Sequence, residues 1–327
     1  MDNNKKYKIG IVGVGPVGQI LAVHLQEAGC EVAVCDIDKP KIMLIQKEGI
    51  RLEGTVEKQC HFKHTYTNIS DLKEFDPDLL IFSIKGYHVP LALEGAGVII
   101  KTESSGQGKP CVISAQNGID VEQMLAGVFG ESNTFRMVVN FAGNQIASNV
   151  VKVTFFNPPN FIASINNSRV EIAEDFSELL NITGLQTQVI DSFEILSKVW
   201  HKTILNASLS ALCGILKFTM KEAMESPDTL EIIEHTITES VEVAKAENII
   251  FGDNFVKSCM GYLQKAGDHY PSLAVDFMNN RQTEIEYING KIVEYGNKHY
   301  IKTPMNLALT NMIKAVSLKN LSKKTDK

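Results

Sequence analysis

A glycine pattern near the start of the chain constrains its fold more than any other feature. Residues 13–18 read Gly-Val-Gly-Pro-Val-Gly, between the strand-like segment 8–12 and the helix-like segment 16–28. In this context the first glycine permits a tight turn, the second lets the backbone approach a pyrophosphate, and the third lets helix and strand pack closely. We therefore expect a dinucleotide-binding turn, with a glycine turn that binds nothing as the alternative. The expected cofactor contacts are Gly13, Gly15, Pro16, Val17 and Gly18.

Strand-like and helix-like segments alternate over the first half of the chain. After segment 8–12, further apolar strands are expected at 31–35, 79–83, 111–114, 150–156 and 161–165. Short apolar strands separated by helices indicate parallel βαβ units and a doubly wound sheet. The expected fold class is therefore α/β, with an N-terminal Rossmann domain.

The second half changes character, because helical periodicity dominates and strand signals vanish. Helices are expected at 193–216, 228–247, 253–265, 271–296 and 305–317. We place the domain boundary near residue 190. Residues 1–190 then form the dinucleotide-binding domain, and residues 191–327 form an all-helical domain that carries substrate and catalysis.

An aspartate closes the second expected strand, 18 residues after Gly18. At this place Asp36 can accept hydrogen bonds from both ribose hydroxyls of NAD and would repel a 2′-phosphate. No arginine lies nearby, and the nearest cations are Lys39 and Lys41. The residue favours NAD(H) over NADP(H). The alternative is an aspartate that simply ends a surface strand.

Composition excludes several classes of protein. Lys+Arg 32 against Asp+Glu 38 gives a net charge of −6, whereas nucleic-acid binders usually carry a basic excess. No window reaches the roughly 18 apolar residues of a membrane span. The six cysteines form no CxxC pair and the eight histidines show no metal-ligand spacing, so neither a metal site nor a disulfide framework is expected. A reducing cytoplasm is the expected location.

Three polar residues interrupt an otherwise apolar helical segment at 193–216. Lys202, Asn206 and Ser210 stand four residues apart and so share one helix face. A lysine amid so much apolar surface is costly unless it is paired or lines a cleft, and partial burial lowers its pKa toward the range useful for proton transfer. The alternative is the solvated face of an amphipathic helix.

A second polar group lies in the expected helix 271–296. Its members are Ser272, Asp276, Glu284 and Asn289. Glu284 could pair with Lys202, although spacing alone does not establish this. Carboxylates on a helix are more often simply solvated.

Several motifs in this order resemble the ketopantoate reductase (2-dehydropantoate 2-reductase) family over about residues 8–315. Besides the glycine turn they are Ile84-Lys85, Gln116-Asn117-Gly118, the segment 199–206 (VWHKTILN) and the segment 281–290 (RQTEIEYING). The last two are specific to the family, whereas the glycine turn is not.

The resemblance implies a reaction and a set of roles. The family reduces the ketone of a branched 2-oxo acid, ketopantoate, to the alcohol pantoate in pantothenate biosynthesis, usually with NADP(H). Lys202 would be the general acid and Glu284 would tune it. Asn206, Ser210 and Ser272 would hold the substrate, and Lys85 and Asn117 would lie near the ribose and nicotinamide of the cofactor.

The sequence also departs from the family pattern at three places. Ser210 stands where an asparagine is common, Met220 stands near another such position, and Asp36 with its neighbours replaces an arginine suited to NADP. These departures leave ketopantoate itself open. An NAD-dependent D-2-hydroxyacid dehydrogenase of broader substrate range is therefore the alternative enzyme.

An alternative of another class is a protein that senses NAD(H) without turnover, against which the retained Lys202 and Glu284 count. The sequence implies a small-molecule partner and leaves a homodimer through the helical domain open.

Overall fold

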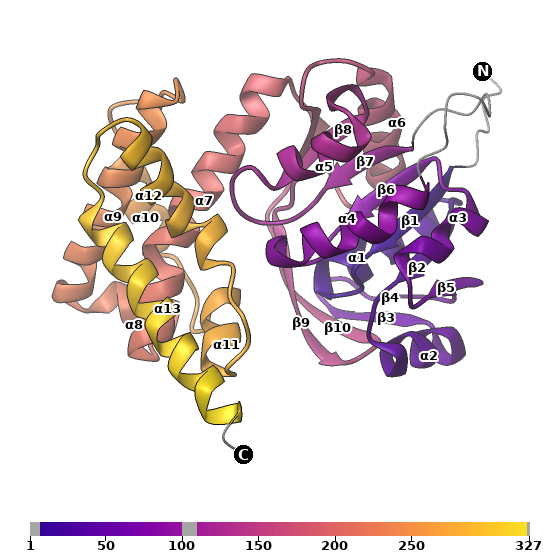
Figure 1. Ribbon diagram of the computed structural model, residues 1–327, viewed down its shortest axis with the longest axis horizontal. Helices are drawn as coiled ribbons and strands as arrows, with labels where there is room; N and C mark the ends of the chain where they lie inside the picture. The colour runs from indigo at the N-terminus through magenta and orange to yellow at the C-terminus, as the bar shows by residue number, and fades with distance from the viewer. Residues whose placement is uncertain (1–6, 100–109, 326–327) are drawn as a thin grey trace. The chain divides into compact units, whose positions relative to one another are not determined.

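The computed structural model describes residues 7–99 and 110–325, with side chains up to residue 320. Its contacts divide the chain into two compact units. The first holds the residues up to Gln116 together with Asp120–Ile195, and the second holds Asn117–Ile119 and the residues from Leu196 onward. The first unit is built on β-sheets and the second on helices (Figure 1).

The first unit contains an eight-stranded sheet. Its strands are β1 (Lys8–Val12), β2 (Glu31–Cys35), β5 (His64–Tyr66), β6 (Leu79–Phe82), β7 (Cys111–Ser114), β8 (Thr134–Val138), β11 (Asn160–Ser164) and β12 (Thr187–Val189). Their order is β12-β11-β8-β7-β6-β1-β2-β5, and neighbours are parallel except β8 and β11. The parallel, doubly wound sheet predicted from the sequence is confirmed, and β1, β2 and β7 have the predicted bounds.

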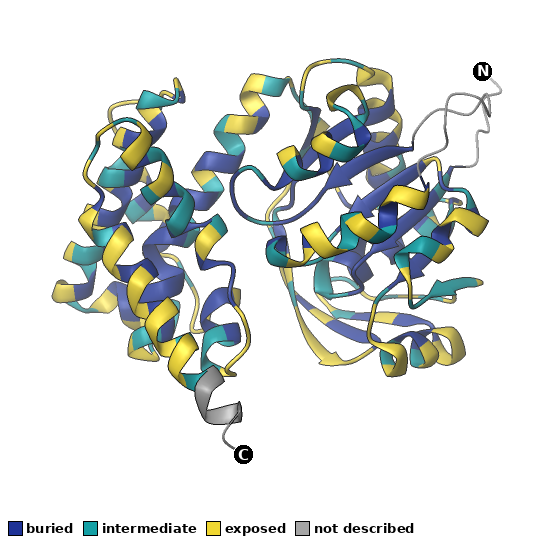
Figure 2. Ribbon diagram, in the orientation of Figure 1, coloured by how far each residue is buried: buried dark blue, intermediate teal, exposed yellow. Residues whose placement is uncertain are grey.

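Helices cover this sheet because its central strands are apolar on both faces. Every residue of β6 and β7 is buried, and a strand of that kind needs packing on each side. Figure 2 shows these strands as buried throughout. The helices of this unit are α1 (Pro16–Glu27), α2 (Lys39–Glu48), α3 (Leu72–Phe75), α4 (Val89–Ala96), α5 (Val121–Phe129) and α6 (Val170–Asn181).

A second, four-stranded sheet in this unit was not predicted. It has the order β4-β3-β10-β9 and consists of β3 (Ile50–Gly54), β4 (Lys58–Cys60), β9 (Phe141–Ala147) and β10 (Val150–Phe156). Only β10 was expected as a strand, and its bounds are confirmed. The sheet joins β3 in parallel to β10, which lies about a hundred residues later in the chain.

The second unit is helical, as predicted. Its elements are α7 (Ser192–Leu216) from Leu196 onward, α8 (Met220–Glu225), α9 (Pro227–Ala246), α10 (Phe255–Leu263), α11 (Ser272–Met278), the 3₁₀ turn η6 (Ile285–Tyr287), α12 (Asn289–Lys298) and α13 (Pro304–Thr325). Pro227 and Pro304 occupy first turns, where a missing N–H costs nothing. The short helix α8, which a Thr219–Glu222 capping box begins, was not predicted.

The single helix predicted at 271–296 is wrong, because the chain there forms α11, η6 and α12 in succession. Asn280 adopts a left-handed backbone conformation (φ 53°), which ends α11. The Arg281 N–H donates to the Asp276 carbonyl, closing a wide turn in place of the next helical bond. Asparagine tolerates this conformation better than most residues, so Asn279-Asn280 was the signal for the break.

Because His24 is buried, we expect the fold to lose stability in mild acid. The side chain is 1% exposed on α1, and its Nδ1 contacts the Thr183 hydroxyl at 3.1 Å. Burial, with a smaller contribution from Lys58, lowers the pKa of His24 to about 4. The unfolded chain therefore binds this proton from about pH 6.5 downward while the folded chain does not.

The His24 contribution to stability is thus present above about pH 6.5 and is lost as the pH falls toward 4. We expect it to remove about 2 kcal/mol from the free energy of unfolding between pH 7 and pH 5. Urea unfolding of the wild type and of His24→Gln at both pH values measures this. The loss on acidification should be smaller in the variant, and equal losses in the two proteins would contradict the prediction.

Candidate functional site

The loops after β1, β2, β6 and β7 leave the same edge of the main sheet. Parallel strands place their carboxyl ends together, and the chain runs from β1 to β2 on one side and later to β6 on the other. Such a reversal of strand order opens a crevice in which α/β proteins bind ligands. The glycine turn, Asp36 and Lys85 all lie in these loops.

The glycine turn has the geometry that its sequence predicts. Gly13 has φ +95°, a conformation that favours glycine, and its N–H donates to the Cys35 carbonyl at 2.8 Å. A Cβ at Gly18 would lie 2.0 Å from the Gly13 carbonyl oxygen, so only glycine fits there. The first and third glycines are therefore required by the close packing of turn and helix.

The same turn leaves an open approach to the start of α1. A Cβ at Gly15 would meet no atom of the described residues within 4 Å, and Gly15, the N-cap residue, has no side chain with which to cap the helix. Pro16 and Val17 follow as half-buried residues of the first turn. An uncapped helix N-terminus with open space in front of it fits the pyrophosphate of a dinucleotide.

Asp36 is tied to the glycine turn. One carboxylate oxygen, Oδ2, accepts from the Val14 N–H at 2.8 Å and from Lys41 Nζ at 3.0 Å, and Oδ1 accepts from the Asp38 N–H at 3.0 Å. The side chain is 12% exposed and that of Lys41 is 14% exposed. The carboxylate therefore has a fixed position beside the turn rather than moving freely at a strand end.

The loop after β6 contacts the glycine turn directly. The Ser83 hydroxyl donates to the Gly13 carbonyl at 2.7 Å. Lys85 follows, half-buried, as the residue before the 3₁₀ turn η2 (Gly86–His88). The structure thus brings the region of Lys85 to the same edge as the glycine turn.

A buried polar network at the end of β7 escaped the sequence analysis. The Arg136 guanidinium on β8 donates to the Ser114 hydroxyl and the Gln116 carbonyl, both at 2.9 Å, and it pairs with Glu122 at 3.1 Å. The Ser114 hydroxyl donates to Gln116 Oε1 at 2.6 Å. Arg136 and Glu122 are 3% and 2% exposed. An arginine in the strand Phe135-Arg136-Met137, where its neighbours are apolar, was the available signal.

This network holds the backbone that leads into the Gln116-Asn117-Gly118 motif. Residues 117–119 themselves belong to the helical unit by their contacts. There the Ile119 N–H donates to the Tyr287 carbonyl at 3.0 Å, and a Cβ at Gly118 would lie 2.7 Å from that of Tyr287. Asn117 is half-buried beside this contact.

In the helical unit, α7 presents Lys202, Asn206 and Ser210 on one face, as their spacing predicts. Lys202 and Asn206 are half-buried, and Ser210 is only 3% exposed. A face that is simply solvated would expose all three side chains. This helix face is therefore only partly open to solvent.

The second polar group separates into different roles. Glu284 is 5% exposed in the bend before η6, and Ser272 is exposed at the start of α11. Asp276 pairs with Arg281 at 2.8 Å. Asn289 donates to the Ala207 carbonyl at 3.0 Å and to Asn306 at 3.1 Å, so it fixes α12 and α13 against α7. Asp276 and Asn289 thus have structural partners. Asp276 and Glu284 are both buried carboxylates, at 8% and 5% exposure.

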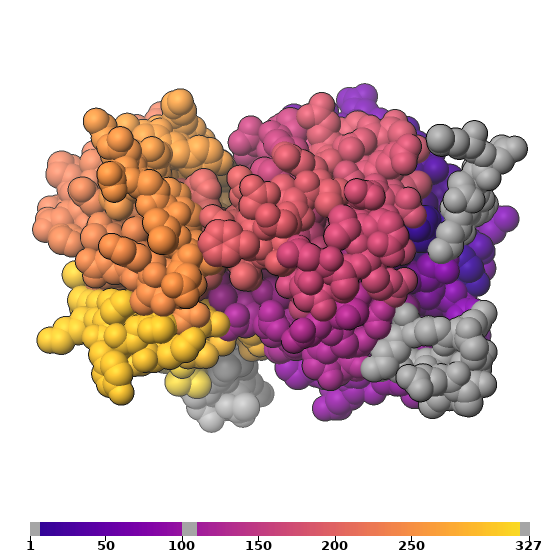
Figure 3. Space-filling model, turned by 90° about the horizontal axis from the view of Figure 1, so that it is seen from above, coloured from indigo at the N-terminus to yellow at the C-terminus, as the bar shows by residue number. Residues whose placement is uncertain are grey.

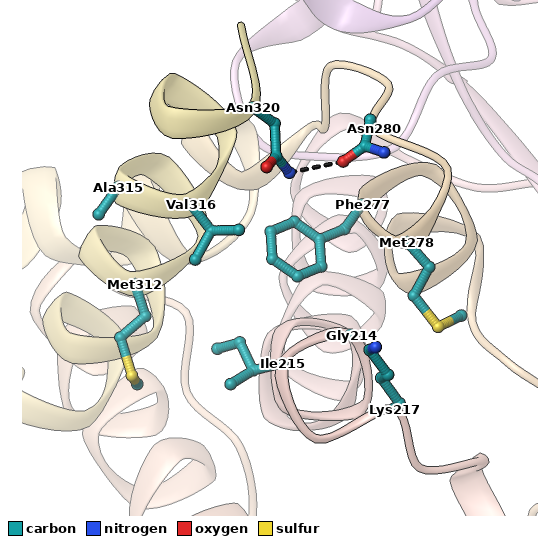
Figure 4. Close-up of a pocket in the computed structure, with 10 residues that line it drawn as sticks. All are labelled: Gly214, Ile215, Lys217, Phe277, Met278, Asn280, Met312, Ala315, Val316 and Asn320. Carbon is teal, nitrogen blue, oxygen red and sulfur yellow. Dashed lines mark hydrogen bonds between the residues drawn. The ribbon is translucent and has the colours of Figure 1, made fainter. Parts of the chain in front are cut away.

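A pocket in the helical unit lies elsewhere (Figure 4). Residues of α7, α11 and α13 and of the segments that follow α7 and α11 line it, namely Gly214, Ile215, Lys217, Phe277, Met278, Asn280, Met312, Ala315, Val316 and Asn320. None is a predicted site residue. Gly214 follows Lys202 by twelve positions, or about 18 Å along the helix axis. This pocket is therefore distinct from the Lys202 face.

Within residues 7–99 and 110–325, no group of three or more His, Cys, Asp or Glu could hold a metal ion. None of the six cysteines, all of which lie in these ranges, forms a disulfide. In the same part of the chain no helix combines the length and apolar character needed to cross a membrane.

Comparison with known proteins gives one consistent family. The profile of the family "Ketopantoate reductase PanE/ApbA" matches residues 9–165, and that of its C-terminal domain matches residues 194–317. The curated 2-dehydropantoate 2-reductase of Pyrococcus abyssi is 28% identical over 307 residues, which are 94% of this chain and 97% of the relative.

Solved structures share the fold. A PanE/ApbA family ketopantoate reductase from Ralstonia eutropha has a TM-score of 0.83 at 21% identity, covering 96% of this chain and 99% of its own. A ternary complex of D-mandelate dehydrogenase with NADH and anilino(oxo)acetate has a TM-score of 0.84 at 24% identity, with the same coverage. At these identities the likeness shows the fold alone.

Proposed function

Because the chain belongs to the ketopantoate reductase family, an oxidoreductase family, we propose that it reduces the ketone of a branched 2-oxo acid with NAD(P)H, and that ketopantoate is its substrate. The observation that carries the proposal is a half-buried Lys202 on the polar face of α7, in a unit that also holds the buried Glu284. The first unit supplies the matching nucleotide-binding edge. The turn would hold the hydride donor and the lysine would supply the proton, which are the two reactants that the reduction of a ketone requires.

The reduced nicotinamide, when bound, supplies the hydride that adds to the ketone carbon. Negative charge then develops on the carbonyl oxygen, where a positioned ammonium stabilises it and donates a proton. We assign this role to Lys202 and assign to Glu284 the tuning of that lysine. Asn206, Ser210 and Ser272 bind the substrate, and Lys85 and Asn117 contact the cofactor.

The departures from the family pattern bear on the choice of 2-oxo acid. Ser210 is shorter than the asparagine that is common at its position, and Met220 begins α8 with its N–H bound to the His269 carbonyl at 2.9 Å. A smaller side chain and an apolar one would both admit a substrate other than ketopantoate. A D-2-hydroxyacid dehydrogenase with a broader range is therefore the second candidate.

Genetic complementation tests the proposed substrate. A bacterial strain that lacks ketopantoate reductase and requires added pantoate should grow without it when it expresses this chain. The Lys202→Ala variant, produced at the same level, should not restore growth. Growth that still requires pantoate, despite soluble wild-type protein, would count against ketopantoate as the substrate.

We also propose that Asp36 gives the site its preference for NADH. Replacing Asp36 by Ala removes the acceptor of the ribose hydroxyls and leaves the Lys41 ammonium, which is otherwise paired with Asp36, able to contact a 2′-phosphate. Hydrogen bonds to a charged group contribute about 1.5–3 kcal/mol, so the ratio of the NADPH to the NADH dissociation constant should fall about tenfold or more. Calorimetric titration with each nucleotide measures the ratio, and an unchanged ratio would remove Asp36 from the ribose site.

A homodimer through the helical unit is proposed as well. Helix α13 carries several exposed apolar side chains, and its surface is seen in Figure 3. The exposed apolar side chains of α13 are Leu307, Met312, Val316 and Leu318. Light scattering of the purified protein distinguishes a dimer from a monomer.

The cytoplasmic location expected from the sequence stays a prediction.

A further inference from the structure

The carboxylate expected to select the cofactor carries a cation of its own. Lys41 Nζ lies 3.0 Å from Asp36 Oδ2, the oxygen that also accepts from the Val14 N–H. Both side chains are largely buried for charged surface residues, at 14% and 12% exposure. The pair therefore has a defined geometry at the end of β2, in contrast to the mobile ion pairs of open surfaces.

The position of Lys41 is fixed from the backbone side as well. Its N–H donates to the side chain of Asp38, which caps α2, at 3.1 Å. It lies in the first turn of α2, where the helix dipole disfavours a cation. Helix stability therefore does not explain a lysine here, whereas the contact with Asp36 does.

The pair changes what Asp36 can do to a nucleotide. An unpaired carboxylate at this place accepts ribose hydroxyls and repels a 2′-phosphate by its charge. With an ammonium 3.0 Å away, the net charge of the pair is zero, so the repulsion is largely cancelled. The carboxylate still has lone pairs for a hydroxyl, and the ammonium can donate to a phosphate, for which lysine acts as a point charge.

We propose that Lys41 is a specificity-determining residue that offsets Asp36, so that the site binds NADPH as well as NADH. The inference rests on the proposed nucleotide site and concerns the breadth of its selection. Asp36 favours the ribose hydroxyls of NADH, and Lys41 keeps the 2′-phosphate of NADPH acceptable. Removing Lys41 should therefore sharpen the selection for NADH, the reverse of removing Asp36.

Direct binding tests this without turnover. The dissociation constants of NADH and NADPH are measured by isothermal titration calorimetry, with no 2-oxo acid, on the wild type, Lys41→Gln and Lys39→Gln. Lys39 is a matched control, since it lies in the same helical turn, is exposed and has the same charge. In Lys41→Gln the NADPH constant should rise about tenfold relative to that of NADH, equivalent to about 1.4 kcal/mol. In Lys39→Gln the two constants should keep their ratio within about twofold, as expected for an exposed surface charge.

A double variant completes the test. Asp36→Ala leaves Lys41 without its carboxylate and should lower the NADPH dissociation constant. Lys41→Gln added to it should reverse that lowering, whereas the weaker binding of NADH that follows from the lost ribose contact should remain. Equal effects of Lys41→Gln on both nucleotides, or the same effect from Lys39→Gln, would overturn the inference while the nucleotide site stands. Failure of the wild type to bind either nucleotide would overturn the proposed function and this inference together. Circular dichroism of each variant confirms that it is folded.

Discussion

Replacing Lys202 by Ala is expected to lower kcat by about two to four orders of magnitude, which is the usual contribution of a positioned general acid. The residue is half-buried on α7, on the face that it shares with Asn206 and Ser210. Without the ammonium, the charge that develops on the carbonyl oxygen has neither a cation nor a proton donor beside it. The loss should therefore appear in kcat, measured as oxidation of the reduced nicotinamide with saturating 2-oxo acid.

Two further measurements separate this role from general damage. The dissociation constant for NADH should stay within about threefold of the wild type, because the residues of the glycine turn lie in the other unit and are unchanged. Lys257→Ala, which removes an exposed lysine on α10, should leave kcat unchanged. Near-normal turnover of Lys202→Ala would exclude Lys202 as the proton donor, and an equal loss in Lys257→Ala would point to a nonspecific effect.

Replacing Glu122 by Ala is expected to destabilise the nucleotide-binding edge strongly. Glu122 in the first turn of α5 pairs with Arg136 at 3.1 Å, and both are buried. Removing one partner leaves a buried guanidinium without its counter-charge, which costs about 3–5 kcal/mol. That is a large part of the roughly 5–15 kcal/mol by which folded proteins are stable.

Urea unfolding followed by circular dichroism measures this loss. Glu122→Gln keeps the shape and one acceptor and should lose less, so the test holds even where Glu122→Ala fails to fold. The double variant Glu122→Leu/Arg136→Met removes both charges and should be more stable than Glu122→Ala. If Glu122→Ala unfolds at the same urea concentration as the wild type, the pair does not stabilise this edge of the sheet.

The parts of the fold that the sequence predicted are those that depend on local pattern. The glycine turn needs residues within a six-residue span, and the strands before and after it are continuous apolar runs. The place of Asp36 beside the turn was predicted from its position in the sequence, 18 residues after Gly18. The bond from the Val14 N–H to its carboxylate supports the predicted proximity.

The parts that escaped prediction depend on contacts between distant residues. Strand β4 has three residues, and most of β9 is exposed, so neither shows a clear apolar alternation. The network around Arg136 joins side chains from β7, α5 and β8, and the local sequence marks it only by an arginine between apolar residues of a strand. The break after α11 was visible only as two adjacent asparagines.

The site residues also divide into those that a local sequence pattern predicted and those that depend on contacts between distant residues. The four-residue spacing of Lys202, Asn206 and Ser210 was enough to place them on one helix face. The burial of Glu284, and the structural role of Asn289 against α7, required the packing of the helical unit. The ion pair between Lys41 and Asp36 likewise required the fold around the end of β2.

The oxidation of NADH and NADPH by the purified wild type, with ketopantoate and a panel of other branched 2-oxo acids, tests the central claim most directly. The proposed function predicts the highest kcat/KM with ketopantoate, with NADH preferred and NADPH accepted. A higher kcat/KM with another 2-oxo acid would instead identify a D-2-hydroxyacid dehydrogenase and would give Ser210 and Met220 a role in that choice. Binding of NADH without turnover of any 2-oxo acid would contradict the claim.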